Sequence, residues 1–196
     1  MPEILRRYAL IIVAALLAVA LAAALLLRGG MNESRPALPT GGDFILQSAD
    51  GTIDSRNWRG QVILVYFGYT HCPDVCPASM TAWAQALKML SAEERQRVRL
   101  LMVSVDPERD TLDHLREYAA FFHPQMIGAT AAPEEIARLA KAYGAGYIRQ
   151  ETAADGSYAV DHTTATYVID PAGKLATMLQ LGAGGDTIAA TIRSLL

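Results

Sequence analysis

Two apolar runs and several amphipathic stretches follow one another after residue 42 and predict one α/β domain. Residues 62–67 and 99–106 have the length and the β-branched and aromatic content of buried strands. After the first run, Met80, Trp83 and Leu87 recur at spacings of three and four, which is typical of a helix with one buried face. The predicted order is hairpin, strand, helix, strand, helix, short strand, helix, long hairpin, two strands and a closing helix.

Turn and cap residues mark the ends of these elements. Asp50-Gly51 is the predicted turn of the first hairpin and Asp155-Gly156 that of the long one. Gly144 ends the third helix, and Asp186 is the predicted N-cap of the last. Alternating strands and helices followed by antiparallel strands predict a mixed sheet with helices on both faces, the arrangement of a thioredoxin-like α/β fold.

The N-terminal segment differs in pattern from the rest. Residues 8–27 form an uncharged run of the length that a helix needs to cross a bilayer, and Arg6 and Arg7 precede it. A cleaved secretory signal is the alternative. The run is longer than the usual signal core, however, and no clear small-x-small cleavage site follows it. We therefore predict an uncleaved transmembrane helix within residues 1–28.

Composition divides the remaining chain into a linker and a domain. Residues 29–42 are rich in Gly and Pro and predict a linker, so the folded domain is expected over 43–196. The arginines before the span agree with the positive-inside rule and place this domain across the membrane. In a bacterium, that predicts a single-pass protein of the inner (cytoplasmic) membrane with its domain in the periplasm, where disulfides can persist.

Charge and motif content exclude some functions. The net charge of −3 and the pI near 5.8 give no electrostatic case for nucleic-acid binding. The chain also lacks a glycine loop of the kind that cradles nucleotide phosphates.

The only two cysteines follow directly on the first apolar strand. Cys72 and Cys76 each precede a proline, and the residue before a proline is disfavoured in helical conformation. Both are therefore predicted to lie in a loop, with Pro77 as the first residue of the next helix. A helix N-terminus favours thiolate. Two thiols there are suited to disulfide exchange, to binding a soft metal or to forming a structural bridge.

Three stretches resemble one known family. They are FGYTHCPDVCP at 67–77, VSVDPERDT at 103–111 and VDHTTATYVID at 160–170. They resemble the Sco/SenC family of membrane-anchored copper proteins, which assist assembly of the dinuclear copper site of cytochrome c oxidase. The similarity extends over most of 43–196.

The family's ligand set implies a copper site at Cys72, Cys76 and His162. His162 lies where thioredoxins carry a proline that faces the cysteines. Two thiolates and an imidazole suit Cu(I) and can also take Cu(II), although zinc accepts the same set. Because a metal needs deprotonated thiols, we expect that a Cys72–Cys76 disulfide could not bind copper in this way.

Other residues near these motifs have simpler predicted roles. His71 and His114 are expected to face solvent. Asp161 is expected either to orient a neighbouring ligand or to cap its own loop. Asp106 and Asp110 are predicted to cap the second helix and shape the rim of the site.

The resemblance leaves two functions open. The first is a copper metallochaperone that delivers copper to the copper-site subunit of cytochrome c oxidase. It would itself receive the copper from an upstream periplasmic copper chaperone. The alternative is a thiol–disulfide reductase that keeps the oxidase's copper-ligand cysteines reduced, with Cys72 and Cys76 as its catalytic thiols. A peroxidase-like or redox-sensing role lacks a supporting pattern. The protein is not expected to be an enzyme of the usual kind. Loss of His162 should separate the two functions, because copper binding should need it and disulfide exchange should tolerate its loss better.

Overall fold

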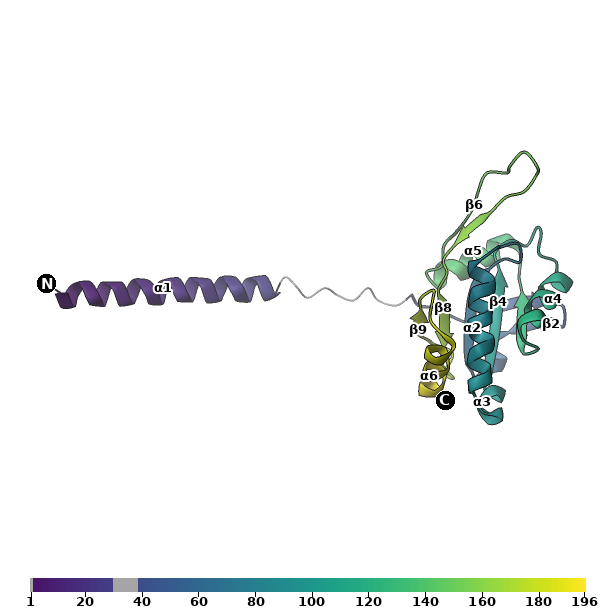
Figure 1. Ribbon diagram of the computed structural model, residues 1–196, viewed down its shortest axis with the longest axis horizontal. Coiled ribbons are helices and arrows are strands. Elements are labelled where there is room, and N and C mark those ends of the chain that lie inside the picture. The colour runs from purple at the N-terminus through teal and green to yellow at the C-terminus, as the bar shows by residue number, and fades with distance from the viewer. Residues whose placement is uncertain (1, 30–38) are drawn as a thin grey trace. The chain divides into compact units, whose positions relative to one another are not determined.

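The computed structural model describes residues 2–29 and 39–196, which fall into two compact units, Met1–Ala37 and Leu38–Leu196 (Figure 1). The first unit contains the helix α1 (Pro2–Gly29). Among the described residues, no helix meets the length and apolarity of a membrane span. The uncleaved transmembrane anchor therefore stays a prediction. Most of the predicted linker, residues 30–38, lies outside the described residues.

A five-stranded mixed sheet forms the centre of the second unit, in the order β5-β4-β3-β8-β9. Strand β3 pairs parallel with β4 and antiparallel with β8; β4 pairs parallel with β5, and β8 pairs antiparallel with β9. The strands are β3 (Val62–Gly68), β4 (Val98–Ser104), β5 (Met126–Ala129), β8 (Thr166–Ile169) and β9 (Leu175–Leu179). All seven residues of β3 are buried, which agrees with its continuous apolar sequence.

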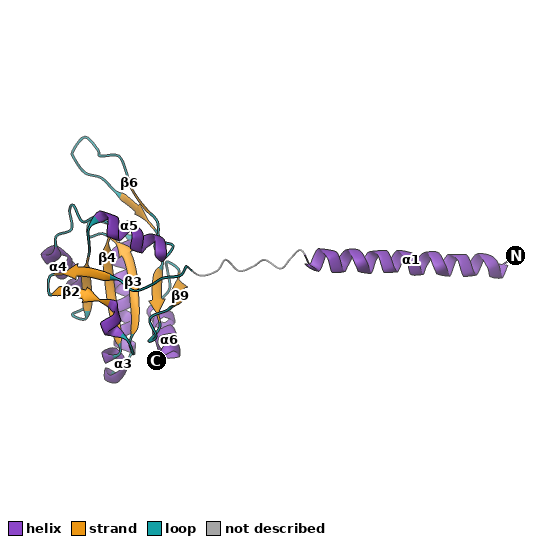
Figure 2. Ribbon diagram, turned by 180° about the vertical axis from the view of Figure 1, so that it is seen from behind, coloured by secondary structure: helices purple, strands orange, loops and turns teal. Residues whose placement is uncertain are grey.

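Two hairpins complete the strands. β1 (Ile45–Ser48) pairs with β2 (Gly51–Asp54) through a two-residue turn one position earlier than predicted, because Ser48 pairs with Gly51. β6 (Tyr147–Arg149) pairs with β7 (Val160–His162). We call residues 147–162 the arm; it projects beyond the sheet in Figures 1 and 2.

Helices cover both faces of the sheet, as the sequence predicts. Trp83 of α2 (Val75–Met89) packs edge-on against Tyr66 of β3. Tyr143, at the C-cap of α5 (Pro133–Ala142), packs against Phe67, the next residue of β3, whose side chain points to the opposite face. Accordingly, α2 lies in front of the sheet in Figure 1 and behind it in Figure 2. Each fully buried large apolar side chain contributes about 1.5–3 kcal/mol, so these contacts fix both layers.

The remaining helices are α4 beside β5, α6 beside α2, and two short ones. Their bounds are α4 (Leu112–Phe122), α6 (Gly185–Leu195), α3 (Ala92–Gln96) and the 3-10 helix η1 (Ser55–Trp58). α3 falls in a charged stretch that the sequence pattern left without structure. Its start is a capping box in which Ser91 and Glu94 satisfy each other's backbone N–H groups. The N-cap of the last helix lies two residues earlier than predicted, at Gly184, which puts Asp186 inside the first turn.

Candidate metal centre

The two cysteines lie on either side of the boundary between a loop and a helix. β3 ends at Gly68, a loop follows, and α2 begins at Val75. Cys72 is in the loop, where its N–H donates to the Tyr69 carbonyl at 3.3 Å. Cys76 is in the first turn of α2, so the prediction that both lie in the loop is wrong for it. The helix tolerates Pro77 because the first-turn N–H groups lack intrahelical acceptors.

Close approach of the backbone brings Cys76 against the end of β3. The Cys76 side chain is fully buried. A Cβ on Gly68 would lie 2.8 Å from Cys76 Sγ and 2.8 Å from the ring of Tyr66. Real Cβ atoms do not make contacts that short, so this position requires glycine for space.

His162 completes the group from the opposite side. It is the last residue of β7, and its Nε2 lies 3.3 Å from Cys76 Sγ. Its Nδ1 lies 3.2 Å from the Thr163 carbonyl oxygen, which can only accept. We assign the proton to Nδ1 from this contact, so the Nε2 lone pair faces the Cys76 thiol and accepts from it.

Two tyrosines hold the imidazole ring in place. The ring of His162 packs edge-to-face with Tyr66 at 5.7 Å and with Tyr69 at 5.8 Å between centroids. The Tyr69 hydroxyl also accepts from the N–H of Val160, two residues before the histidine. Residues at the end of β3 therefore orient both Cys76 and His162.

Burial keeps Cys76 and His162 neutral when no metal is bound. It raises the pKa of the Cys76 thiol, and it lowers the pKa of His162. Binding a cation between them requires the thiol to lose its proton, and the charge of the cation offsets the desolvation that opposes the thiolate.

Asp110 anchors the cysteine loop, and this role replaces the predicted one. The N-cap of α4 is Thr111. Asp110 is 1% exposed and accepts from the backbone N–H of Thr70 at 3.0 Å, from the Thr70 hydroxyl, and from the Ser104 hydroxyl at 2.6 Å. The carboxylate thus ties the loop that carries Cys72 to the end of β4.

Asp106 takes part in a second linkage, which the sequence analysis did not find. The Tyr158 ring of the arm lies 3.5 Å from the guanidinium carbon of Arg109 and 3.7 Å from that of Arg149. The Tyr158 hydroxyl donates to Asp106 at 2.8 Å, and Arg149 pairs with Glu108 at 2.7 Å. The arm, and with it His162, is thereby attached to the loop after β4. Arg109 and Tyr158 lie 49 residues apart in the chain, so the sequence carries no local signal for their contact.

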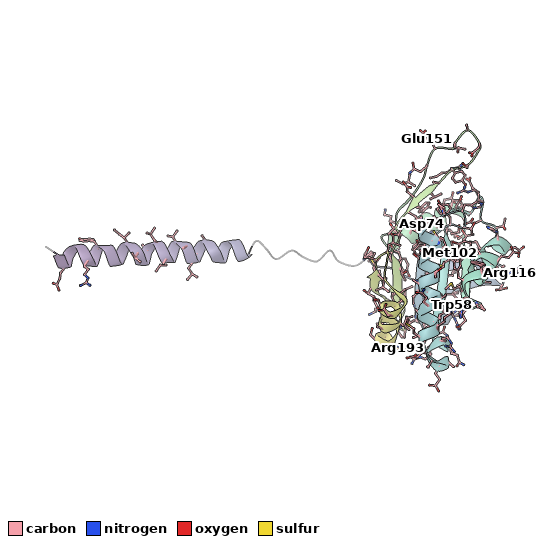
Figure 3. The ribbon with its side chains drawn as sticks, in the orientation of Figure 1. Trp58, Asp74, Met102, Arg116, Glu151 and Arg193 are labelled. Atoms are coloured by element: carbon pink, nitrogen blue, oxygen red, sulfur yellow. The ribbon has the colours of Figure 1, made fainter. Side chains whose placement is uncertain are left out.

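An open groove of about 340 Å³ exposes one side of the centre. Cys72 and His162 line it together with Pro73, Val75 and Asp161. Figure 3 labels Asp74, where the loop enters α2, and Glu151, on the arm. A ligand carried by another protein can approach the centre through this groove.

The donor atoms fit one small, soft ion. Sγ of Cys72, Sγ of Cys76 and a ring nitrogen of His162 lie within 4.8 Å of one another. Ligands of a small ion at about 2.0–2.3 Å lie roughly 3.3–4 Å apart, so closing on the ion shortens each donor–donor distance by about 1.5 Å or less. Both cysteines are free thiols, as binding requires. A sulfur-rich site with one imidazole suits copper or zinc.

Comparison with known proteins identifies the family. The family described as SCO1/SenC matches residues 32–196. The chain belongs to the SCO1/SenC family. It is 43% identical to the protein SenC of Rhodobacter capsulatus over an alignment of 132 residues. This alignment covers 67% of this chain and 59% of SenC. The chain spans about half the length of the curated relatives that it matches, from 39% to 59% for five of them.

Solved structures of SCO1/SenC proteins share the fold. The solution structure of apo Sco1 from Thermus thermophilus aligns with a TM-score of 0.74 and 33% identity, over 83% of this chain and 95% of that one. The structure of Bradyrhizobium japonicum ScoI with copper bound aligns with a TM-score of 0.73 and 32% identity, over 80% of this chain and 99% of that one. The thioredoxin-like α/β prediction is confirmed, and relatives of this chain bind copper.

The other residues singled out in the sequence lie around the Cys72–Cys76–His162 group without joining it. Asp161 is exposed and accepts from the Gln150 side chain at 2.6 Å, which braces the arm. His71 and His114 are exposed, as predicted. Their rings nevertheless lie close together, with centroids 6.0 Å apart.

Proposed function

We propose that Cys72, Cys76 and His162 bind one copper ion and that the protein delivers it to the dinuclear copper site of cytochrome c oxidase during assembly. The observation that carries this proposal is the convergence of three soft donors, from two segments of the chain, beside an open groove. Membership of the SCO1/SenC family and the copper-bound relative support it.

The groove suits transfer by ligand exchange. Cys72, which is 8% exposed, lines it on a loop, whereas Cys76, on α2, is 0% exposed and does not line it. A sulfur or imidazole of the receiving protein can therefore displace Cys72 first, while Cys76 and His162 still hold the ion. The receiving protein is the copper-site subunit of the oxidase, and an upstream periplasmic chaperone supplies the copper.

A thiol–disulfide reductase is the second candidate, because both thiols are free. In that reaction, the Cys72 thiolate attacks a disulfide of the partner and releases one partner thiolate. Cys76 then attacks the Cys72 sulfur, which releases the second partner thiol and leaves a Cys72–Cys76 disulfide. The raised pKa of Cys76 disfavours it as the first nucleophile and assigns that role to Cys72.

His162→Ala separates the two functions. The reduced full-length protein in detergent is assayed for copper transfer to a purified oxidase copper-site subunit and, separately, for reduction of that subunit's disulfide. If delivery is the function, transfer falls by at least about a hundredfold, while disulfide exchange changes by less than about threefold. Unchanged copper transfer in the variant would overturn the delivery proposal.

We also propose that the N-terminal segment anchors the protein in the inner membrane with the copper domain in the periplasm. The uncharged run at 8–27 and the arginines before it support this orientation. In spheroplasts, protease added outside should degrade the domain. A domain that stays protected until the membrane is lysed would contradict the orientation.

A further inference from the structure

Two histidines outside the Cys72–Cys76–His162 centre lie side by side next to it. His71 directly precedes Cys72 in the loop, and His114 is in the first turn of α4. Their ring centroids are 6.0 Å apart with an interplanar angle of 45°. Both side chains are exposed, His71 by 48%.

A buried carboxylate fixes the proton on His71. The Thr70 hydroxyl has one proton, which it donates to Asp110, an acceptor-only carboxylate with a fully buried side chain. The Thr70 oxygen can therefore only accept from His71 Nδ1, which lies 3.1 Å away. Assigned in this way, His71 carries its proton on Nδ1, and the lone pair of Nε2 is left free.

This relay is what a metal-binding histidine requires. Histidines that bind metals donate their other ring N–H to a carboxylate or another acceptor, which sets the tautomer and ring orientation. Imidazoles that share one ion, with metal–nitrogen bonds of about 2.0–2.1 Å, can have their ring centres up to about 6 Å apart. The site offers nitrogen without sulfur, which suits Cu(II) rather than Cu(I).

We propose that His71 and His114 form a second, outer copper site that holds Cu(II) at the protein surface beside Cys72. Thr70 and Asp110 are its positioning residues. Water occupies the remaining coordination positions, since both side chains face solvent. The proposal goes beyond delivery from the inner centre, because it stands whether or not that centre transfers copper.

The test removes the inner centre and titrates what remains. The full-length protein in detergent, carrying Cys72→Ser, Cys76→Ser and His162→Ala, is titrated with Cu(II) and followed by electron paramagnetic resonance and calorimetry. One bound Cu(II) with coupling to imidazole nitrogen is expected. His71→Gln or His114→Gln, added singly, should each weaken it by at least about tenfold.

Two further variants control the result. His123→Gln removes a histidine at the opposite end of α4 and should change the affinity by less than about twofold. Thr70→Val keeps both imidazoles but removes the relay, and should weaken binding by about 10–100-fold. Binding that survives both His71→Gln and His114→Gln, or that falls equally with His123→Gln, overturns the outer site. His114 is exposed on a helix, so His114→Gln should fold. If Thr70→Val does not fold, the Cu(II) affinity of His114→Gln decides whether the outer site exists.

Discussion

Cys72 and Cys76 belong to the same motif, yet different parts of the fold hold them in place. Cys76 is fixed by close packing: it lies in the first turn of α2, fully buried against Gly68 and 3.3 Å from His162. Cys72 is in a loop whose position depends on Asp110, a residue distant in sequence. Both cysteines are buried, but Cys76 is 0% exposed within a helix, whereas Cys72 is 8% exposed on a tethered loop that lines the groove.

Under the delivery proposal, this difference would let one centre both retain and release an ion. Cys76 and His162 form the retained half, because packing against β3 holds both. Cys72 forms the releasable half, because its loop is tied down by a few hydrogen bonds to one carboxylate. Variants that affect one half and spare the other therefore test the comparison directly.

The largest effect on stability is expected at the retained half, which contains Cys76. Gly68→Ala places a methyl group 2.8 Å from Cys76 Sγ and from the Tyr66 ring, and overpacking of this kind costs about 3 kcal/mol of unfolding free energy. Chemical denaturation of the full-length protein in detergent measures it. Gly146→Ala is the control, since its Cβ would meet only Thr163 Oγ1 at 4.0 Å. Equal stabilities for the two variants would show that Cys76 is not closely packed.

A smaller effect, confined to the releasable half that contains Cys72, is expected for Asp110→Asn. The amide NH₂ would face hydroxyl and backbone donors, so about 1–3 kcal/mol of unfolding free energy should be lost. The alkylation rate of Cys72 should rise while that of Cys76 stays the same, as mass spectrometry of the labelled protein would show. Asp113→Asn, on the surface beside Arg116, is the matched control. Equal acceleration at both cysteines would contradict the separate tethering of Cys72.

The arm should show the smallest effect. Tyr158→Leu removes the contacts with Arg109 and Arg149 and the hydrogen bond to Asp106, which together are worth about 1–2 kcal/mol. Hydrogen exchange should speed up across β6 and β7 and leave β3 unaffected. Glu151→Gln, elsewhere on the arm, should leave hydrogen exchange unchanged in β6, β7 and β3. Unaltered exchange in β7 would mean that Tyr158 does not hold the strand that carries His162.

Local patterns in the sequence predicted most of the fold. The apolar run at 62–67 and the helical spacing of Met80 and Trp83 depend on neighbouring residues, and both predictions are confirmed. The long hairpin is also present, but its turn is centred on Ala154-Asp155, one position earlier than predicted, because the Gly156 N–H donates to the Ala153 carbonyl. The start of α2 was misplaced, because the preference against helix before a proline is weak in a first turn.

Long-range contacts could not be predicted in the same way. Asp110 looks like a helix cap in the sequence, because it precedes a helix. Its partners, Thr70 and Ser104, become neighbours only when β3 pairs with β4. His162 was assigned from family resemblance, and the structure places it against Cys76. The anchor and the ligand roles remain proposals.

The most direct test of the central claim is the copper stoichiometry and affinity of the reduced full-length protein, beside Cys72→Ala, Cys76→Ala and His162→Ala. Competition with a Cu(I) chelator gives the affinity, and elemental analysis gives the stoichiometry. The proposal predicts one tightly bound copper, weakened in all three variants, and most in Cys76→Ala because Cys76 belongs to the retained half. Copper held equally well by the three variants and the parent protein would contradict the Cys72–Cys76–His162 centre.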